Sequence, residues 1–129
     1  MMNAVEIEQA ISDLAAQPFD SAEFPFAFLE AFGNKATTIK KLRQGASNAS
    51  DVSGGVLQRS NIHIATCGAG DVDDTIKALR DSPKTAAAKA KFILATDGDQ
   101  FLAEDLASGE IVSCAYADFP DHFGVFLPL

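Results

Sequence analysis

The stretch KFILATDGDQFLAEDLASGEIVSCAY, from Lys91 to Tyr116, carries the clearest strand pattern in the sequence. Apolar residues concentrate in three short runs, which cover residues 91–96, 101–105 and 111–116. Between the runs lie Asp97-Gly98-Asp99 and Ser108-Gly109, residue types that favour tight turns. The pattern therefore predicts three consecutive strands joined by hairpin turns.

Two more strands are predicted upstream, at residues 56–59 and 61–67. In the second, alternation places Ile62, Ile64 and Thr66 on one face and His63, Ala65 and Cys67 on the other. Gly68-Ala69-Gly70 ends this strand as a plain turn. It resembles a phosphate-binding loop only weakly, because it lacks a third glycine. The carboxylates of Asp71, Asp73 and Asp74 would also repel phosphate.

A helix is predicted directly after this turn, with Asp71 as its cap and Val72, Ile76 and Leu79 on its inner face. Ser82-Pro83 interrupts that helix, and residues 86–90 resume it briefly. A short helical turn is also predicted at residues 118–122.

Three helices are predicted in the N-terminal part of the chain. The first covers residues 4–16, and the third covers 35–44 with Ile39 and Leu42 inward. The second begins at a capping box formed by Asp20 and Glu23 and ends at Gly33. Its phenylalanines lie four residues apart, a spacing typical of a core-facing helix stripe: Phe24, Phe28 and Phe32.

This order of elements predicts an α+β fold of three layers, in which helices precede and interrupt a mixed sheet. A chain of 129 residues fits one domain, with a helical part over 1–45 and a sheet with interposed helices over 56–116. No apolar run reaches the roughly 20 residues of a membrane helix. The two cysteines form no disulfide framework, so a reducing cytoplasm is expected.

Charge is distributed very unevenly along the chain, whose formal net charge is −8. All ten lysines and arginines fall between Lys35 and Lys91, while residues 1–34 and 92–129 hold only acids. A basic patch of this kind can contact a DNA backbone despite the negative total, although a solvated helix face is the plainer explanation. The candidate contacts are Lys35, Lys40, Lys41, Arg43, Arg59, Lys84 and Lys89, with Lys91 nearby.

The C-terminal half resembles the N-terminal domain of MmeI-type restriction–modification proteins. The similarity lies in Thr96-Asp97, Asp105-Leu106, Gly109-Glu110 and the closing Pro120-Asp121-His122-Phe123 with Phe126. The stretch AEFPFAFLEAFGNKATTIKKLRQG, residues 22–45, also looks like family members known mainly for DNA methylation. The resemblance implies a restriction-endonuclease-like core, placed before helical, adenine-N6 methyltransferase and target-recognition domains on one polypeptide. The apolar C-terminal end of the chain fits such a fragment.

In nuclease members of that family, an acid and a Glu-x-Lys pair hold Mg²⁺ and activate water. The positions of that pair here are Ala65 and Cys67, whose methyl and thiol groups cannot replace a carboxylate and an ammonium. We therefore expect a degenerate nuclease site, an inactive isolated domain and no catalytic residue within it. The alternative is a Mg²⁺-dependent endonuclease with a migrated site at Asp51 or Asp97.

Other constellations in the sequence are weaker. His63 and Cys67 could form a zinc site only with Cys114 and His122, and burial of both cysteines is the better interpretation. The acids Asp97, Asp99, Glu104 and Asp105 fit a solvated hairpin better than a metal site. No methyltransferase motif occurs, so S-adenosylmethionine is expected only in the parent protein.

The resemblance leads to one preferred function and one remaining alternative. The preferred function is a phage-defence module that contacts DNA or docks onto the downstream methyltransferase and helical domains. The alternative is an acidic protein-interaction module that never touches DNA.

Overall fold

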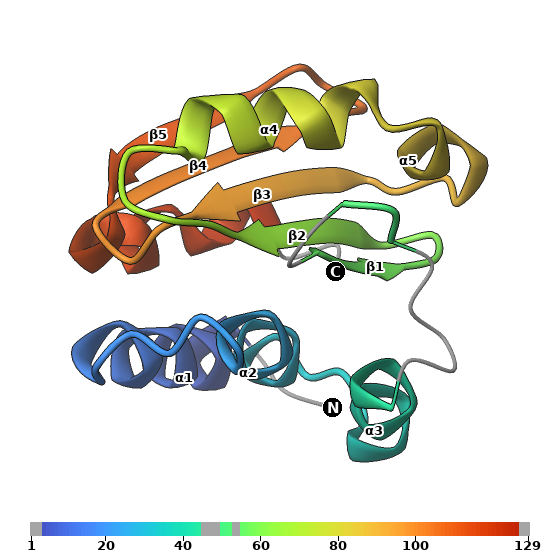
Figure 1. The fold of residues 1–129 in the computed structure, drawn as a ribbon. Helices are drawn as coiled ribbons and strands as arrows, with labels where there is room; N and C mark the ends of the chain where they lie inside the picture. The colour runs from blue at the N-terminus through green and yellow to red at the C-terminus, as the bar shows by residue number, and fades with distance from the viewer. Residues whose placement is uncertain (1–3, 45–49, 53–54, 127–129) are drawn as a thin grey trace.

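A computed structural model describes residues 4–44, 50–52 and 55–126 of the chain (Figure 1). A lower layer of helices, a five-stranded sheet and an upper layer of helices are stacked, which confirms the predicted three-layer α+β fold. The helices are α1 (Ala4–Ala16), α2 (Phe24–Ala31), α3 (Ala36–Arg43), α4 (Val72–Asp81), α5 (Pro83–Ala87) and the 3₁₀ helix η1 (Tyr116–Phe126). The strands are β1 (Gly55–Gln58), β2 (Ile62–Thr66), β3 (Phe92–Thr96), β4 (Gln100–Asp105) and β5 (Ile111–Ala115).

The strands lie in the order β1-β2-β3-β4-β5, and every neighbouring pair is antiparallel except β2 and β3. Those two run parallel because α4 and α5 carry the chain back to the starting end of the sheet between them. In their register Ile62 lies opposite Phe92 and Thr66 opposite Thr96. The hairpin predicted after this crossover, between β3 and β4, is confirmed, and β1 and β2 form another hairpin before it. Among the described helices, none combines the length and hydrophobicity needed to cross a bilayer.

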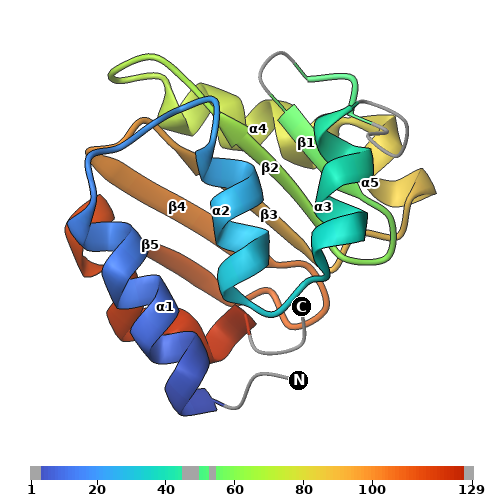
Figure 2. The same cartoon turned by 90° about the horizontal axis from the view of Figure 1, so that it is seen from below.

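The lower core is built from aromatic rings, among them the α2 phenylalanines that the sequence predicts on one helix stripe. Phe28 of α2 is fully buried, and its ring centroid lies 4.9 Å from that of Phe32 and 5.4 Å from that of Phe126. Phe101 of β4 stacks on Phe119 of η1 at 4.8 Å, so sheet and 3₁₀ helix enter the same cluster. Figure 2 shows α1 and α2 lying across the underside of the sheet, where they close this core.

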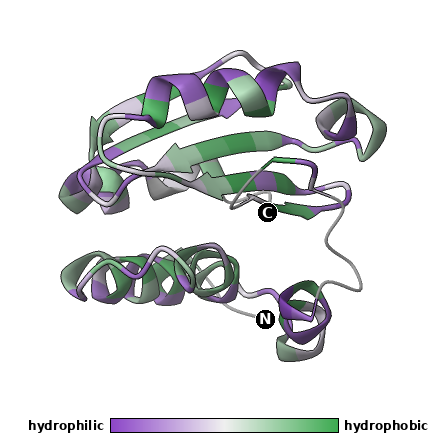
Figure 3. Cartoon of the chain, viewed as in Figure 1, coloured by the Kyte–Doolittle hydropathy of each residue, from purple (hydrophilic) through white to green (hydrophobic). Residues whose placement is uncertain are grey.

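The upper core forms where α4 packs on β2, β3 and β4. Leu79 of α4 is fully buried, and the sheet residues beneath the helix are Ala65, Ile93 and Ala95, each with 0% exposure. Because both faces of the central strands are covered, these strands are hydrophobic along their length, whereas the outer side of α4 is hydrophilic (Figure 3). Along β2 the alternation therefore places one set of side chains, at 62, 64 and 66, toward the lower core. The other set, at 63, 65 and 67, lies toward the upper core.

The turn between β3 and β4 requires glycine at its centre. Gly98 has φ of +90°, and a Cβ there would lie 2.5 Å from the Phe19 ring. The positive φ and this close approach explain why the Asp-Gly-Asp sequence forms the hairpin at this point.

Several local predictions were wrong. The capping box of α2 does not form: Asp20 accepts a hydrogen bond from the Ala22 N–H at 3.0 Å, and Glu23 forms an ion pair with Arg43 of α3. Glu23 thus pairs with a charged residue of the neighbouring helix and not with a backbone N–H group at the start of α2. Asp71 likewise precedes α4 without a side-chain cap.

The helix that follows the break at Ser82-Pro83 begins earlier than predicted. α5 starts at Pro83, whose ring suits a first helical turn, and Ser82 Oγ accepts a hydrogen bond from the Lys84 N–H at 3.2 Å. The predicted short turn near residue 120 is part of the longer η1.

Candidate nucleic-acid interface

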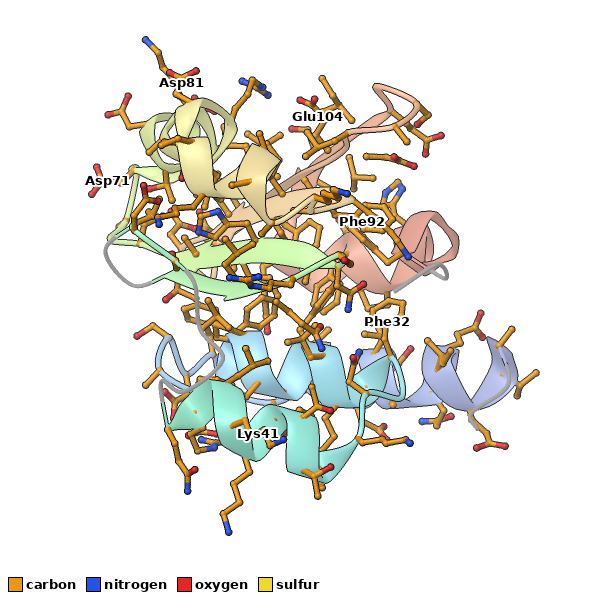
Figure 4. All side chains as sticks on the ribbon, turned by 90° about the vertical axis from the view of Figure 1, so that its right-hand side faces the viewer. Phe32, Lys41, Asp71, Asp81, Phe92 and Glu104 are labelled. Atoms are coloured by element: carbon orange, nitrogen blue, oxygen red, sulfur yellow. The ribbon has the colours of Figure 1, made fainter. Side chains whose placement is uncertain are left out.

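The outer face of α3 presents the densest group of positive charges. Ile39 and Leu42, with 5% and 2% exposure, turn one side of this helix into the core. Helical geometry then leaves Lys40, Lys41 and Arg43 exposed, and Lys35 is exposed immediately before the helix. Figure 4 shows Lys41 extending away from the lower layer into solvent. The inward orientation predicted for Ile39 and Leu42 is confirmed.

The positive charges on α3 are not equivalent. Arg43 pairs with Glu23, and its guanidinium carbon lies 4.5 Å from the centroid of the Phe26 ring. Among the described residues, Lys35, Lys40 and Lys41 form no ion pair. Their charge is therefore available to a phosphate, whereas Arg43 would have to share its guanidinium with Glu23.

The remaining candidates lie at the same end of the molecule, in the upper half. Arg59 is exposed on the β1–β2 turn, and Lys84 and Lys89 are exposed on and after α5. The Ser60 N–H donates to the Ala88 carbonyl at 2.8 Å, which ties this turn to α5. In Figure 1, α3, the β1–β2 turn and α5 all lie on the right-hand side, so tertiary structure gathers the seven candidates at one end.

An acidic hollow lies between α4 and residues 51–52. Its volume is about 680 Å³, and its carboxylates come from Asp51, Asp71, Asp74 and Asp81. Figure 4 shows Asp71 and Asp81 on the upper part of the molecule, remote from Lys41 below. This part of the surface repels phosphate, so the lysine-bearing side of this end is the candidate surface for a phosphate backbone.

The two predicted degenerate nuclease positions differ in environment. Ala65 is fully buried in the sheet beneath α4, surrounded by aliphatic side chains. Cys67, just beyond β2, is half-buried, and its thiol donates to the Thr96 carbonyl at 3.6 Å. Burial, with smaller contributions from Asp97 and Asp71, raises the pKa of the Cys67 thiol, which keeps it protonated and a poor metal ligand.

The acids of the alternative endonuclease site are already engaged in local structure. Asp97 accepts hydrogen bonds from the backbone N–H groups of Gln100, Asp99 and Gly70 at 2.8, 2.9 and 3.0 Å. These bonds, the one from Gln100 first, lower the pKa of Asp97. Asp51 accepts from Ser82 Oγ at 2.5 Å. Asp51 and Asp97 also line different hollows, so the structure does not bring them together.

The structure gives His63 a role that sequence reasoning missed. Its Nε2 lies 2.7 Å from Ser50 Oγ and its Nδ1 lies 2.8 Å from Thr85 Oγ1, which in turn donates to the Leu79 carbonyl at 2.7 Å. Since the Thr85 proton is used on that carbonyl, His63 donates from Nδ1 and accepts from Ser50. The fully buried ring thus joins β2, α5 and the segment at residue 50.

Both nitrogens of His63 are occupied, so the imidazole offers no ligand to a metal. Among the residues that the structure describes, no group of three or more His, Cys, Asp or Glu side chains is arranged to hold an ion. A Cβ on Gly55 would overlap Ser50 Oγ, which explains the glycine at the start of β1. In the sequence, Gly55 is the residue that could have indicated the close approach of Ser50, but this role is clear only once the fold is known.

Burial of His63 predicts a pH-dependent stability. Desolvation lowers its pKa to about 4, against the ordinary 6.5. Between these values the unfolded chain binds a proton that the folded chain does not, so the free energy of unfolding falls as pH decreases from 7 to 4. We expect a loss on the order of 2 kcal/mol from this group, measured by urea denaturation at several pH values.

Two substitutions isolate this effect from the titration of carboxylates. His63→Gln is expected to flatten the pH dependence between 7 and 5, whereas His122→Gln, at an exposed position, should retain the wild-type slope. Equal slopes for wild type and His63→Gln would show that His63 does not carry the effect.

Comparison with known proteins places this geometry in context. The family model described as "MmeI, N-terminal domain" matches residues 2–129. DNA methyltransferase A of Bacillus subtilis (strain 168) is 23% identical over 126 residues, which are 98% of this chain and 14% of that protein. The chain therefore spans about one seventh of the length of this curated relative. No solved structure matches significantly.

Proposed function

Because the chain belongs to the MmeI N-terminal domain family, we propose that it serves a restriction–modification DNA methyltransferase as a DNA-backbone-contacting module. Its basic end contacts the phosphates next to the site that the parent protein methylates. The parent protein uses S-adenosylmethionine, which binds in its methyltransferase domain, and acts in phage defence. Within this chain the nuclease site is degenerate.

The observation that carries the proposal is the end formed by α3, the β1–β2 turn and α5. Lys35, Lys40 and Lys41 are exposed without acid partners among the described residues, and Arg59, Lys84 and Lys89 extend the positive surface across the upper half. Side chains of this type contact phosphates without reading bases, which suits a module that accompanies a separate target-recognition domain.

The environment of Ala65 supports the loss of nuclease chemistry. A buried methyl group beneath α4 offers neither an oxygen ligand nor a water path, and the protonated thiol of Cys67 offers no positive charge. Asp51 and Asp97 are held by Ser82 and by backbone donors, so neither restores the site. Cleavage of an unmethylated plasmid by the parent protein with Mg²⁺, lost on substitution of Asp51 or Asp97, would contradict this part of the proposal.

Charge reversal on α3 tests DNA contact. We expect Lys40→Glu/Lys41→Glu to abolish binding of a fluorescent duplex, because it replaces two phosphate contacts by two repulsions. Lys41→Glu alone should weaken binding by about tenfold. Wild-type affinity should fall with salt, with a slope of about −0.9 per phosphate contacted, and the slope should be shallower for Lys41→Glu. Fluorescence anisotropy at two or more salt concentrations measures both quantities.

The matched control is Lys77→Glu, which makes the same charge change at an exposed lysine on α4. It is expected to leave affinity within about twofold of wild type, with only the long-range repulsion of an added acid. Absence of binding, or binding that is insensitive to Lys40→Glu/Lys41→Glu, would contradict backbone contact. Docking onto the methyltransferase would then be the better account of the basic end.

A further inference from the structure

The outer strand β5 carries main-chain groups that its neighbour does not use. The Asp105 N–H donates to the Glu110 carbonyl and the Tyr116 N–H to the Asp99 carbonyl, both at 2.8 Å. In this antiparallel register the even-numbered residues of β5 exchange hydrogen bonds with β4. Ile111 and Ser113 therefore direct their N–H and C=O groups to the open side of the strand, where the described residues supply no partner.

The opposite margin of the sheet is different. At β1, the Gly55 N–H donates to the Val52 carbonyl at 2.9 Å, and the Gln58 side chain donates to Asn34 at 3.1 Å. The backbone of residue 52 thus pairs with the start of β1, and a side-chain bond links the end of β1 to Asn34, ahead of α3.

The strand β5 also lacks the usual protection against edge pairing. Its sequence IVSCA contains no charge and no proline, and Ile111 is 59% exposed. The helix α4 packs on β2, β3 and β4, which leaves the side chains of Ile111, Ser113 and Ala115 exposed on the upper face. A strand with these properties is a template for a further strand.

The negative charge around β5 determines which kind of strand can pair with it. Glu110 is exposed at its start, and Asp118 and Asp121 are exposed beyond its end. Both aspartates lie close enough to contribute to the raised pKa of the Cys114 thiol, whose main cause is burial. Residues 92–129 contain seven acids and no base. A strand that pairs here meets negative charge at both ends.

We propose that β5 binds an extended segment of a partner polypeptide, which carries lysine or arginine at both ends and small aliphatic residues between them. Main-chain hydrogen bonds to Ile111 and Ser113 supply the pairing, and the acids fix its position along the strand. A second copy of this chain is disfavoured, because antiparallel β5–β5 pairing would bring Glu110 of each copy toward the acids after β5 of the other. This surface is separate from the basic end and does not depend on DNA contact.

Replacing Ser113 with proline tests the pairing without breaking the sheet. The Ser113 N–H faces away from β4, so proline removes only the outward donor and blocks the approach of another strand. The probe is a fluorescein-labelled peptide of alternating threonine and valine with lysine at each end. The 129-residue chain is expected to bind it, Ser113→Pro to bind at least about tenfold more weakly, and Ser113→Thr to bind like wild type.

A peptide with glutamate in place of both lysines separates charge selection from general stickiness, and is expected to bind about tenfold more weakly. Circular dichroism confirms that Ser113→Pro retains the fold. The proposal is overturned by no binding up to about 1 mM, by equal binding to Ser113→Pro, or by equal binding of the glutamate peptide. Concentration-dependent dimers that Ser113→Pro abolishes would also overturn it, in favour of a second copy.

Discussion

Replacing Phe28 with alanine is expected to lower the free energy of unfolding by about 3–5 kcal/mol, the largest loss from any single truncation in the chain. Phe28 is fully buried, and its ring contacts those of Phe24, Phe32, Phe101 and Phe126. Its removal leaves a cavity that α2, β4 and η1 all border. Since domains are stable by only about 5–15 kcal/mol, this loss would be a large fraction of the total stability.

Urea denaturation followed by circular dichroism measures this loss. The matched control is Phe26→Ala, because Phe26 is only half-buried at the margin of the core and its ring also contacts the Arg43 guanidinium. We expect it to cost about 1 kcal/mol. If Phe28→Ala leaves too little folded protein, Phe28→Leu should still show a reduced midpoint. Equal losses at positions 26 and 28 would contradict the central place of Phe28.

Replacing Ala65 with glutamate is expected to destabilise the protein by about 3–5 kcal/mol at pH 7. Ala65 lies beneath Val72, Ile76 and Leu79 of α4, so a glutamate there would have no partner and no water. Its carboxyl group would take up a proton more readily in the folded than in the unfolded state. The deficit of Ala65→Glu should therefore shrink as pH falls toward 5.

Two controls separate charge, volume and position in this experiment. Ala65→Gln adds nearly the same volume without a charge, and its deficit should not change with pH. Cys67→Lys places a charge at the half-buried end of the same strand, where the ammonium can reach solvent, and should cost about 1 kcal/mol or less. Wild-type stability of Ala65→Glu at pH 7 would show that the position still accommodates a nuclease carboxylate.

Much of the fold could be predicted from local sequence, because its signals act over short distances. The Asp97-Gly98-Asp99 sequence favours a tight turn, and this turn joins β3 and β4 in the predicted hairpin. The spacing of Val72, Ile76 and Leu79 identified the inner face of α4. Capping failed at Asp20 and Glu23 because Arg43, twenty residues away from Glu23, offered a stronger charged partner.

The candidate interface was predictable in composition but not in arrangement. Helical periodicity alone indicated that Lys40 and Lys41 face outward, since Ile39 and Leu42 take the inner positions. Whether Arg59 joins α3 or α5 depends on the β1–β2 turn, which a backbone bond to Ala88 holds against α5. No local pattern contains that bond.

The α+β class, the phenylalanine core and the separation of charge along the chain could all be predicted from local sequence, because turns, periodicity and residue type are local properties. Three features are visible only in the folded chain: His63 joins Ser50 to Thr85, Ala65 is buried beneath α4, and β5 ends the sheet with an unpaired edge. Each of these depends on which distant segments meet. Which distant segments meet depends on how whole layers pack against one another, so no short stretch of residues can predict it.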